Sequence, residues 1–333
     1  MRRVFSGIQP SGDLHIGNYL GAVRNWVELQ AQYECFICIV DYHAITQPYD
    51  TATLSQRTFD MAVGLLAAGI DPERCTLFVQ SHVREHTELS WIFNTVTPLG
   101  DLERMTQFKD KAARQESVPA GLLNYPVLQA ADVLLYKADL VPVGEDQVQH
   151  VELMREIVRK WNARYGEGVF PEPEAMVGVA RRIMGLDGQA KMSKSLGNTI
   201  GMLDSPDDVW QRLRPAMTDP ARVKRVDPGN PDVCNIYSLH QHFSSEETVQ
   251  HVANQCRSAG WGCIDCKRVL AAGIEERFSP MRARAADLNA DPAQVHAILA
   301  AGADRARVVA EATMADVRDH MGLMSPERTT ASR

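Results

Sequence analysis

Residues 2–18 read RRVFSGIQPSGDLHIGN. The apolar pair Val4–Phe5 predicts a short buried strand, and the Pro-Ser-Gly sequence at 10–12 predicts a turn. A helix is then expected to begin near Gly17 and to run through Val27 or beyond. The free amides and the dipole at a helix N-terminus attract anions. The stretch predicts one unit of an α/β sheet with an anion site at its edge, although an ordinary strand-turn-helix with incidental glycines would fit as well.

A second stretch, KMSKSLGN at residues 191–198, indicates which kind of anion the site would bind. It places two lysines and two hydroxyl groups within five residues, and Gly188 and Gly197 flank it. A loop of this composition can close on a triphosphate and stabilise a transferring nucleotidyl group. An isolated Lys-x-x-Lys is usually a solvated surface, but the two stretches together predict a nucleoside triphosphate pocket.

The string KMSKS at 191–195, together with HIGN at 15–18, resembles the paired signatures of class I aminoacyl-tRNA synthetases, with Asn in place of the final His of HIGH. Other segments resemble the tryptophanyl-tRNA synthetase family in particular: residues 5–12, 40–46, 104–109, 122–136 and 141–147. The similarity is dense from Val4 to about Ser195, thinner afterwards, and returns from about Gly302 to Leu323. It implies a ligase that activates L-tryptophan with ATP to tryptophanyl-adenylate and transfers it to tRNA(Trp).

Asp132 is the residue that bears on which amino acid is used. It lies in a mostly apolar run, 125–136, that reads as a buried helix after Pro126. A buried carboxylate requires donors, which an internal Arg or a helix end could supply. In the family the matching Asp accepts the indole N–H. Tyrosyl enzymes share these signatures, but they usually have Tyr before this Asp, whereas Ala131 leaves room for an indole; Gln129 replaces a common Met.

The resemblance implies the rest of the site residue by residue. It implies a tryptophan pocket of Asp132, Phe5, Gly7, His43, Gln129, Val141, Val143 and Gln147. It implies an ATP site of Gln9, Pro10, Ser11, His15, Gly17, Asn18, Gly144, Glu145, Asp146, Gln147, Ile183, Lys191, Met192, Ser193, Lys194 and Ser195. The groups expected to promote the reaction are Lys191, Lys194, Ser193, Ser195, Lys111 and Gln9. Catalysis would rest on positioning and charge rather than on a protein nucleophile, with Mg²⁺ carried by ATP.

The whole-chain properties agree with an ordinary globular enzyme. The 333 residues are 45% hydrophobic and 23% charged, and neither a signal peptide nor a membrane span is evident, so the cytoplasm and no membrane partner are expected. A net charge of −7 argues against a general nucleic-acid binder. A local cationic surface for tRNA is nevertheless a candidate, with solvated surface as the alternative for each member: Arg212, Arg214, Arg222, Lys224, Arg225, Lys267 and Arg268.

Periodicity predicts an α/β organisation followed by helices. Buried strands are expected at Val4–Phe5, Cys35–Asp41, Thr76–Gln80 and Leu140–Val143, with helices between them as in parallel βαβ units. With the resemblance, this predicts a Rossmann-type parallel-sheet catalytic domain with a helical insertion that forms a homodimer interface, then an all-helical anticodon-binding domain. The catalytic domain is expected at 1–185, with the insertion at about 80–130, and the KMSKS loop at 186–200. The anticodon-binding domain is expected at 201–290. A C-terminal helix at 291–324, which contains the alanine-rich run Pro292–Met321, and a disordered tail at 325–333 should follow.

Four cysteines in the helical part form the pattern C-x21-C-x6-C-x2-C: Cys234, Cys256, Cys263 and Cys266. The Cys-x-x-Cys pair can place two thiolates on one ion or cluster. A [4Fe–4S] cluster, a zinc ion and unliganded cysteines all fit; some tryptophanyl-tRNA synthetases carry a four-cysteine cluster in this region, so the resemblance favours iron–sulfur. The other three cysteines, Cys35, Cys38 and Cys75, are expected to be small buried hydrophobes, the first two on opposite faces of one strand.

Two other functions remain compatible with these residues. A paralogue that binds tryptophan or a protein without charging tRNA would keep the fold, although intact Lys191, Lys194, Asp132 and Asp146 disfavour it. A small-molecule adenylyltransferase could use a similar helix, but such enzymes usually lack the KMSKS partner and a helical C-terminal domain.

Overall fold

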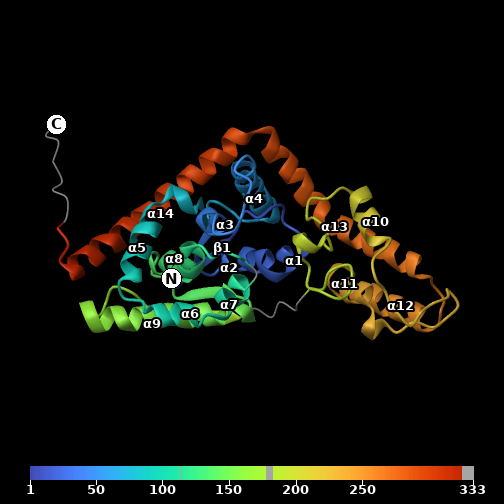
Figure 1. Ribbon diagram of the computed structural model, residues 1–333. Coiled ribbons are helices and arrows are strands. Elements are labelled where there is room, and N and C mark those ends of the chain that lie inside the picture. The colour runs from blue at the N-terminus through green and yellow to red at the C-terminus, as the bar shows by residue number, and fades with distance from the viewer. Residues whose placement is uncertain (114, 178–182, 325–333) are drawn as a thin grey trace.

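The computed structural model describes residues 1–113, 115–177 and 183–324 (Figure 1). Within these residues the centre of the molecule is an all-parallel sheet in the order β3-β2-β1-β4-β5. The strands are β1 Arg3–Ile8, β2 Glu34–Ile39, β3 Cys75–Val79, β4 Leu140–Val143 and β5 Glu174–Val177. This confirms the Rossmann-type sheet. The tail 325–333, expected to be disordered, lies outside the described residues.

Helices connect the strands of the sheet. The first crossover is a continuous helical run of α1 Ile16–Asn18, a π-helical turn η1 Tyr19–Val23 and α2 Arg24–Leu29. The second contains α3 Asp41–Ala44 and α4 Leu54–Ala68. Between β3 and β4 lie η2 Gln80–His82, α5 Glu85–Asn94, α6 Leu99–Glu103, α7 Thr106–Ala112 and α8 Ala120–Leu134. The last crossover is η3 Glu145–Gln147 and α9 Val148–Tyr165.

The remainder of the described chain is helical. Its elements are η4 Lys194–Leu196, α10 Pro206–Leu213, η5 Pro231–Val233, α11 Asn235–Phe243, α12 Glu246–Arg257, α13 Cys263–Ala290 and α14 Pro292–Met321. Figure 1 shows α13 and α14 meeting at an apex, α13 extending to the lobe of α10, α11 and α12 while α14 returns over the sheet. A Cβ on Gly302 of α14 would lie 1.8 Å from the Leu77 carbonyl oxygen, so glycine is required for this close approach to β3.

The core lies on both faces of the sheet, as period-2 alternation in the strands dictates. Val4 and Ile37 belong to the cluster on the face that α4 and α13 cover, whereas Phe5 and Phe36 belong to the cluster of α8, α9 and α14. Cys35 and Cys38 fall into different clusters, which confirms their expected placement on opposite faces.

Two sequence expectations differ from the structure. The helix that carries Asp132 begins at Ala120 and continues through Pro126, six residues before its expected start; proline removes one intrahelical donor, and tertiary packing of a buried helix outweighs that loss. The sequence analysis also did not expect β5, a four-residue strand that follows two prolines and is half-buried only at its two central residues. Among the described residues no helix is long and apolar enough to cross a membrane.

Candidate functional site

The candidate site lies where four parallel strands end. Gln9 follows β1, His43 follows β2, Gln80 follows β3 and Gly144 follows β4. Because the strands are parallel, their carboxyl ends share one edge of the sheet, which is where open α/β sheets bind ligands. Segments that are far apart in the sequence therefore contribute to one site.

The part of the site where the sequence predicts phosphate binding begins at His15, the N-cap of α1. Its Nδ1 accepts from the Asn18 amide at 3.2 Å, and the Asn18 side-chain oxygen accepts from the His15 amide at 3.2 Å. Since Nδ1 accepts, Nε2 carries the proton and is the imidazole donor. The sequence placed both residues in the ATP site; the helix cap uses their acceptors, His15 Nδ1 and the Asn18 oxygen, and not the donor groups His15 Nε2–H and Asn18 Nδ2.

The KMSKS loop packs directly against this first signature. His15 forms an antiparallel bridge with Gly201, and the Ile16 amide donates to the Ile200 carbonyl oxygen at 2.9 Å. The Lys194 Nζ lies 3.4 Å from the position of a Cβ on Gly12, whose φ of +119° also favours glycine. The structure thus brings together the two stretches that the sequence singled out.

A buried asparagine that sequence reasoning missed supports the loop. The Asn198 side chain accepts from the Ser193 amide at 2.8 Å and donates to the Asp187 carboxylate at 2.9 Å. A Cβ on Gly185 would lie 2.0 Å from the Asn198 amide nitrogen, so glycine makes room for it. The sequence signal for Asn198 was the Leu-Gly-Asn segment that follows KMSKS. Ile183 is buried beside the loop and accepts from the Met192 amide at 3.0 Å.

Electrostatics in this part of the site follow from burial among cations. Burial, together with the charges of Lys194 and Lys191, lowers the pKa of His15 to about 4, so the imidazole is neutral at neutral pH. Burial lowers the pKa of Lys194 to about 8, while Asp13 raises it and Arg57 lowers it further. A desolvated ammonium group close to a helix N-cap is suited to a polyanion, which would supply the missing counter-charge.

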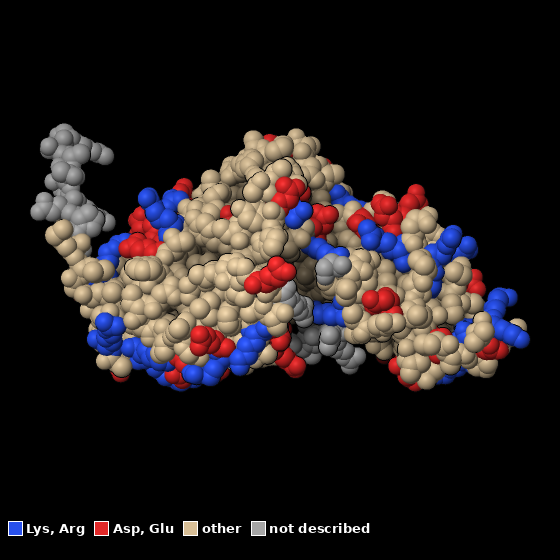
Figure 2. All heavy atoms as spheres, viewed as in Figure 1, with Lys and Arg blue, Asp and Glu red and all other residues tan. Residues whose placement is uncertain are grey.

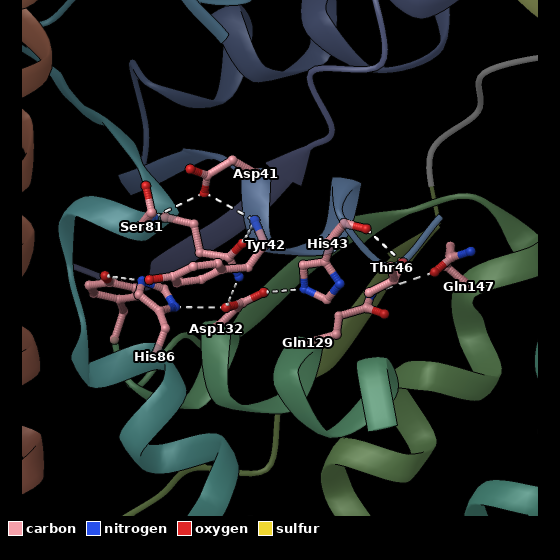
Figure 3. Close-up of polar contacts among 11 residues, drawn as sticks. Asp41, Tyr42, His43, Thr46, Ser81, His86, Gln129, Asp132 and Gln147 are labelled. Atoms are coloured by element: carbon pink, nitrogen blue, oxygen red, sulfur yellow. Dashed lines mark hydrogen bonds and ion pairs between the residues drawn. The ribbon is translucent and has the colours of Figure 1, made fainter. Parts of the chain in front are cut away.

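Asp132 occupies the other end of the site and is 1% exposed (Figure 3). His43 Nε2 lies 2.7 Å from Oδ2, His86 Nδ1 lies 2.7 Å from Oδ1, and Gln80 Nε2 donates to Oδ1 at 2.6 Å. The expected donors of a buried carboxylate are therefore present, but they are two histidines and an amide rather than an Arg or a helix end. Although burial opposes it, His43 and His86 hold the pKa of Asp132 well below its usual range.

The apolar residues expected around an indole lie on the two strands that flank this part of the sheet. Phe5, in β1, and Val141, in β4, are buried, and Val143 at the end of β4 is half-buried. Within β1, a Cβ on Gly7 would lie 2.9 Å from a Val40 methyl carbon. The Gln129 amide group donates to the Gln147 side-chain oxygen at 3.5 Å, which connects α8 to the end of β4.

Asp146, one of the residues of the expected ATP site, lies in η3 after β4. Its carboxylate oxygen would lie 2.7 Å from a Cβ on Gly144, so the glycine permits this conformation. Gln107, from the helical insertion, donates to the Asp146 main-chain oxygen at 3.2 Å, and Gln147 donates to its carboxylate at 3.3 Å. Gln107 was not among the predicted residues, and its place within the family-like segment 104–109 was the only signal for it.

Lys111 lies in α7 and packs on Tyr125. Its Nζ is 4.7 Å from the centroid of the Tyr125 ring, and burial lowers its pKa. The Tyr125 hydroxyl is 3.0 Å from Nε2 of buried His150, another residue that the sequence did not reveal. Pro10 and Ser11 form the turn after β1, Glu145 begins η3, and Ser195 lies in η4.

Comparison with known proteins shows which family the chain belongs to. A family model described as "tRNA synthetases class I (W and Y)" matches residues 1–279. The chain belongs to the class I tRNA synthetases. The synthetase is 57% identical over 329 residues to a tryptophan–tRNA ligase of Deinococcus radiodurans, covering 97% of this chain and 99% of that one. It is 45% identical over 328 residues to a tryptophan–tRNA ligase of Thermotoga maritima, with the same shares covered.

A solved structure gives the same result for the synthetase. The Campylobacter jejuni tryptophanyl-tRNA synthetase complexed with ADP and tryptophan superposes with a TM-score of 0.90 at 38% identity, covering 96% of this chain and 100% of that one. The fold, the two signatures and the sequence relationship all lead to one family.

The four cysteines of the synthetase's helical part line one small pocket, with Arg222 and Trp261 at its wall. Arg222 Nη1 lies 4.0 Å from the Cys256 sulfur and 3.9 Å from the Cys263 sulfur. Among the described residues, however, no group of three or more His, Cys, Asp or Glu side chains is placed to hold a metal ion. The fold thus brings the four cysteines to one pocket, and their spacing does not decide between a cluster, a zinc ion and unliganded thiols.

Two of the proposed tRNA-facing cations have other roles in the structure. Lys267 is 4% exposed, and its Nζ donates to the Arg214 and Ala216 carbonyl oxygens at 2.7 Å each. Arg222 points into the cysteine pocket and donates to the Trp261 carbonyl oxygen at 2.7 Å. Charge alone had placed both at the surface, but the fold uses them to satisfy carbonyl groups. Figure 2 shows basic and acidic side chains interspersed over the lobe of α10–α12.

Proposed function

We propose that this synthetase activates L-tryptophan with ATP and transfers it to tRNA(Trp). The observation that carries the amino-acid assignment is the Asp132 carboxylate, which is buried and held ionised by His43 and His86, because indole has a single polar atom, an N–H donor. The relatives support the same substrate, since two are tryptophan–tRNA ligases and one binds tryptophan in its crystal structure.

In the first step, the tryptophan carboxylate would attack the α-phosphorus of Mg-ATP in line, giving tryptophanyl-adenylate and pyrophosphate. Lys194, beside the turn at Gly12, and Lys191 would neutralise the charge on the phosphates, with His15 Nε2–H as a neutral donor. Lys111 would leave the Tyr125 ring to meet pyrophosphate. Asp146 would accept from the ribose hydroxyl groups. Nothing here requires a protein nucleophile, so positioning and charge supply the rate enhancement.

In the second step, the 2′-hydroxyl of the terminal tRNA ribose would take the acyl group and release AMP. We propose that the helical region 201–290 binds the anticodon and that Lys224, Arg225, Arg212 and Arg214 belong to the tRNA-facing surface. The reaction would take place in the cytoplasm, where tRNAs are charged for translation.

The deciding experiment is tryptophan-dependent exchange of pyrophosphate into ATP, with tyrosine in parallel, on anaerobically purified protein. Exchange with tryptophan alone, followed by aminoacylation of tRNA(Trp), is the expected result. Exchange with neither amino acid in folded protein would contradict the assignment and favour a paralogue that does not charge tRNA.

We propose that the helical insertion forms a homodimer. Its α5 helix presents Trp91, which is 72% exposed, beside a broad hollow walled by Ile45, Tyr49, Tyr125 and Leu128. A large exposed aromatic next to an apolar hollow is typical of an association surface. Sedimentation of the wild type as a dimer and of Trp91→Glu as a monomer is expected. Val308→Glu, on α14 and 70% exposed, is the matched control and should stay dimeric.

We propose that the four cysteines hold a [4Fe–4S] cluster. All four cysteines face one pocket, and such a cluster takes one thiolate on each of its four irons. When bound, it would supply a redox-active anionic centre that links α11, α12 and α13.

The residues around the pocket suit an anionic occupant. The Arg222 guanidinium lies beside two sulfurs, and its Nε is buried without a partner among the described residues. The Cys266 sulfur is 3.4 Å from Nε2 of His240, which is fully buried. These groups would balance thiolate charge and keep solvent out, while the cysteines themselves hold the lobe together.

Cys263→Ser is expected to abolish the visible absorbance of anaerobically purified protein and to lower its iron and sulfide content. The lobe of α10–α12 should then unfold at a lower temperature, because it loses a cross-link between helices. Cys35→Ser, in a strand of the sheet, is the matched control and should keep the absorbance. Zinc found in place of iron, or colourless wild-type protein, would count against the cluster.

A further inference from the structure

One oxygen of Asp132 is fully used by residues outside the expected tryptophan pocket. Oδ1 accepts from Gln80 at 2.6 Å and faces His86 Nδ1 at 2.7 Å. A carboxylate oxygen has two lone-pair positions, so Oδ1 has none left. Oδ2 faces His43 alone among the described contacts and keeps one position. The carboxylate is therefore asymmetric, with one oxygen anchored and one available.

The protonation of His86 follows from its neighbours. The ring is fully buried, and its Nε2 lies 2.8 Å from the Tyr136 hydroxyl. The ionised carboxylate only accepts, so Nδ1 of His86 carries the proton, and in the neutral imidazole Nε2 accepts from the hydroxyl. Tyr136, His86 and Asp132 thus form one directional chain of hydrogen bonds.

Each donor to Oδ1 is itself oriented by a third group. The Tyr136 ring stacks on Phe36 at a centroid distance of 4.6 Å and on Phe5 at 5.5 Å, which fixes its hydroxyl. The Gln80 side-chain oxygen accepts from the Tyr42 amide at 3.1 Å, which turns its NH₂ group toward Asp132. Groups outside a ligand pocket that lock a polar side chain in this way determine how accurately it meets the ligand.

We propose that His86, held by Tyr136, is a positioning residue for tryptophan selection. With Gln80 it anchors Oδ1, so that Oδ2, beside His43, is the oxygen offered to the indole N–H. His86 does not touch the amino acid and acts only through Asp132. This role rests on the proposed function. An aromatic ring without the N–H would leave the last position on a buried charge unpaired, and binding of that ring is penalised accordingly.

The test compares L-tryptophan with its analogue in which sulfur replaces the indole N–H, in pyrophosphate exchange. The wild type is expected to prefer tryptophan strongly. In His86→Leu, kcat/KM for tryptophan should fall about 10- to 100-fold, the size of one hydrogen bond to a charged group, while the analogue changes little. The preference of the enzyme for tryptophan over the analogue should therefore fall by the same factor of about 10- to 100-fold, and KM for ATP should stay constant. His86→Asn, whose NH₂ group can replace Nδ1–H, should retain part of the preference.

A second variant keeps the proposal testable if His86→Leu does not fold. Tyr136→Phe removes one oxygen atom and should lower the preference in the same direction by a smaller factor, whereas Tyr165→Phe, on α9, should not. An equal loss for both substrates, or an unchanged preference in Tyr136→Phe, would overturn the proposal in favour of a purely structural role. Failure of the wild type to exchange with either substrate would instead count against the proposed function.

Discussion

Replacing Lys194 by alanine is expected to lower kcat/KM for ATP in pyrophosphate exchange about 100- to 1,000-fold, the range seen when one preorganised charge-stabilising group is removed. The Nζ packs against the turn at Gly12, next to the capped helix start at His15, so its charge is placed where the phosphates of ATP would lie. KM for tryptophan should change far less, because Lys194 lies at the opposite end of the site from Asp132. Lys109→Ala, in α7, is a control with the same change of charge.

The pH dependence of the same reaction provides an independent check on Lys194. Its pKa is lowered to about 8 by burial, so in the free enzyme the ammonium group loses its proton as the pH rises through that value. Because kcat/KM reports ionisations of the free enzyme, it should fall above about pH 8 in the wild type. Lys194→Arg keeps its charge at all these pH values and should lack this decline. An identical alkaline decline in the arginine variant would assign it to another group.

Replacing Asp132 by asparagine is expected to lower kcat/KM for tryptophan about 100-fold or more, at the upper end of what a hydrogen bond to a buried charge contributes. The change removes the negative charge that faces both His43 and His86, at almost constant volume. KM for ATP should stay close to that of the wild type. Because the pKa of Asp132 lies well below its usual range, the loss should be the same from about pH 5 to pH 9.

Asp316→Asn is the matched control for Asp132. It makes the same chemical change at an exposed carboxylate on α14, whose partner is Lys137 at 2.8 Å, and exchange should be unaffected. A parallel rise in KM for ATP in Asp132→Asn would mean that the whole site has been distorted, and it would remove the argument that this carboxylate reads the indole.

The parts of the site that could be predicted are local in sequence. Strand, turn and helix signals in residues 2–18 placed β1 and the start of α1, and Asp132 could be recognised as a buried carboxylate that needs donors. Its donors could not be identified, because Gln80 lies 52 and His86 lies 46 positions away in the chain, on other elements. The same limit applies to Asn198, whose support of the KMSKS loop depends on how the loop folds back.

Among the sequence signals, charge was the least reliable guide to which side chains lie at the protein surface. Lys267 reads as a surface cation, yet α13 buries it against two main-chain carbonyl groups, and Arg222 turns inward to the cysteine pocket. A lysine or arginine pattern records only that a charge is present. The solvent or the acceptor it meets is decided by the helices that pack around it.

The sequence by itself determined the alternation of strands and helices, the pairing of the two signatures and the family, because these depend on residue periodicity and on short motifs. Only the tertiary structure decided that Tyr136, His86 and Gln80 anchor one oxygen of Asp132, and that four cysteines and an arginine share a pocket. The physical reason is that hydrogen bonds and buried charges are satisfied across parallel strand ends and between packed helices, where neighbours in space are not neighbours in the chain.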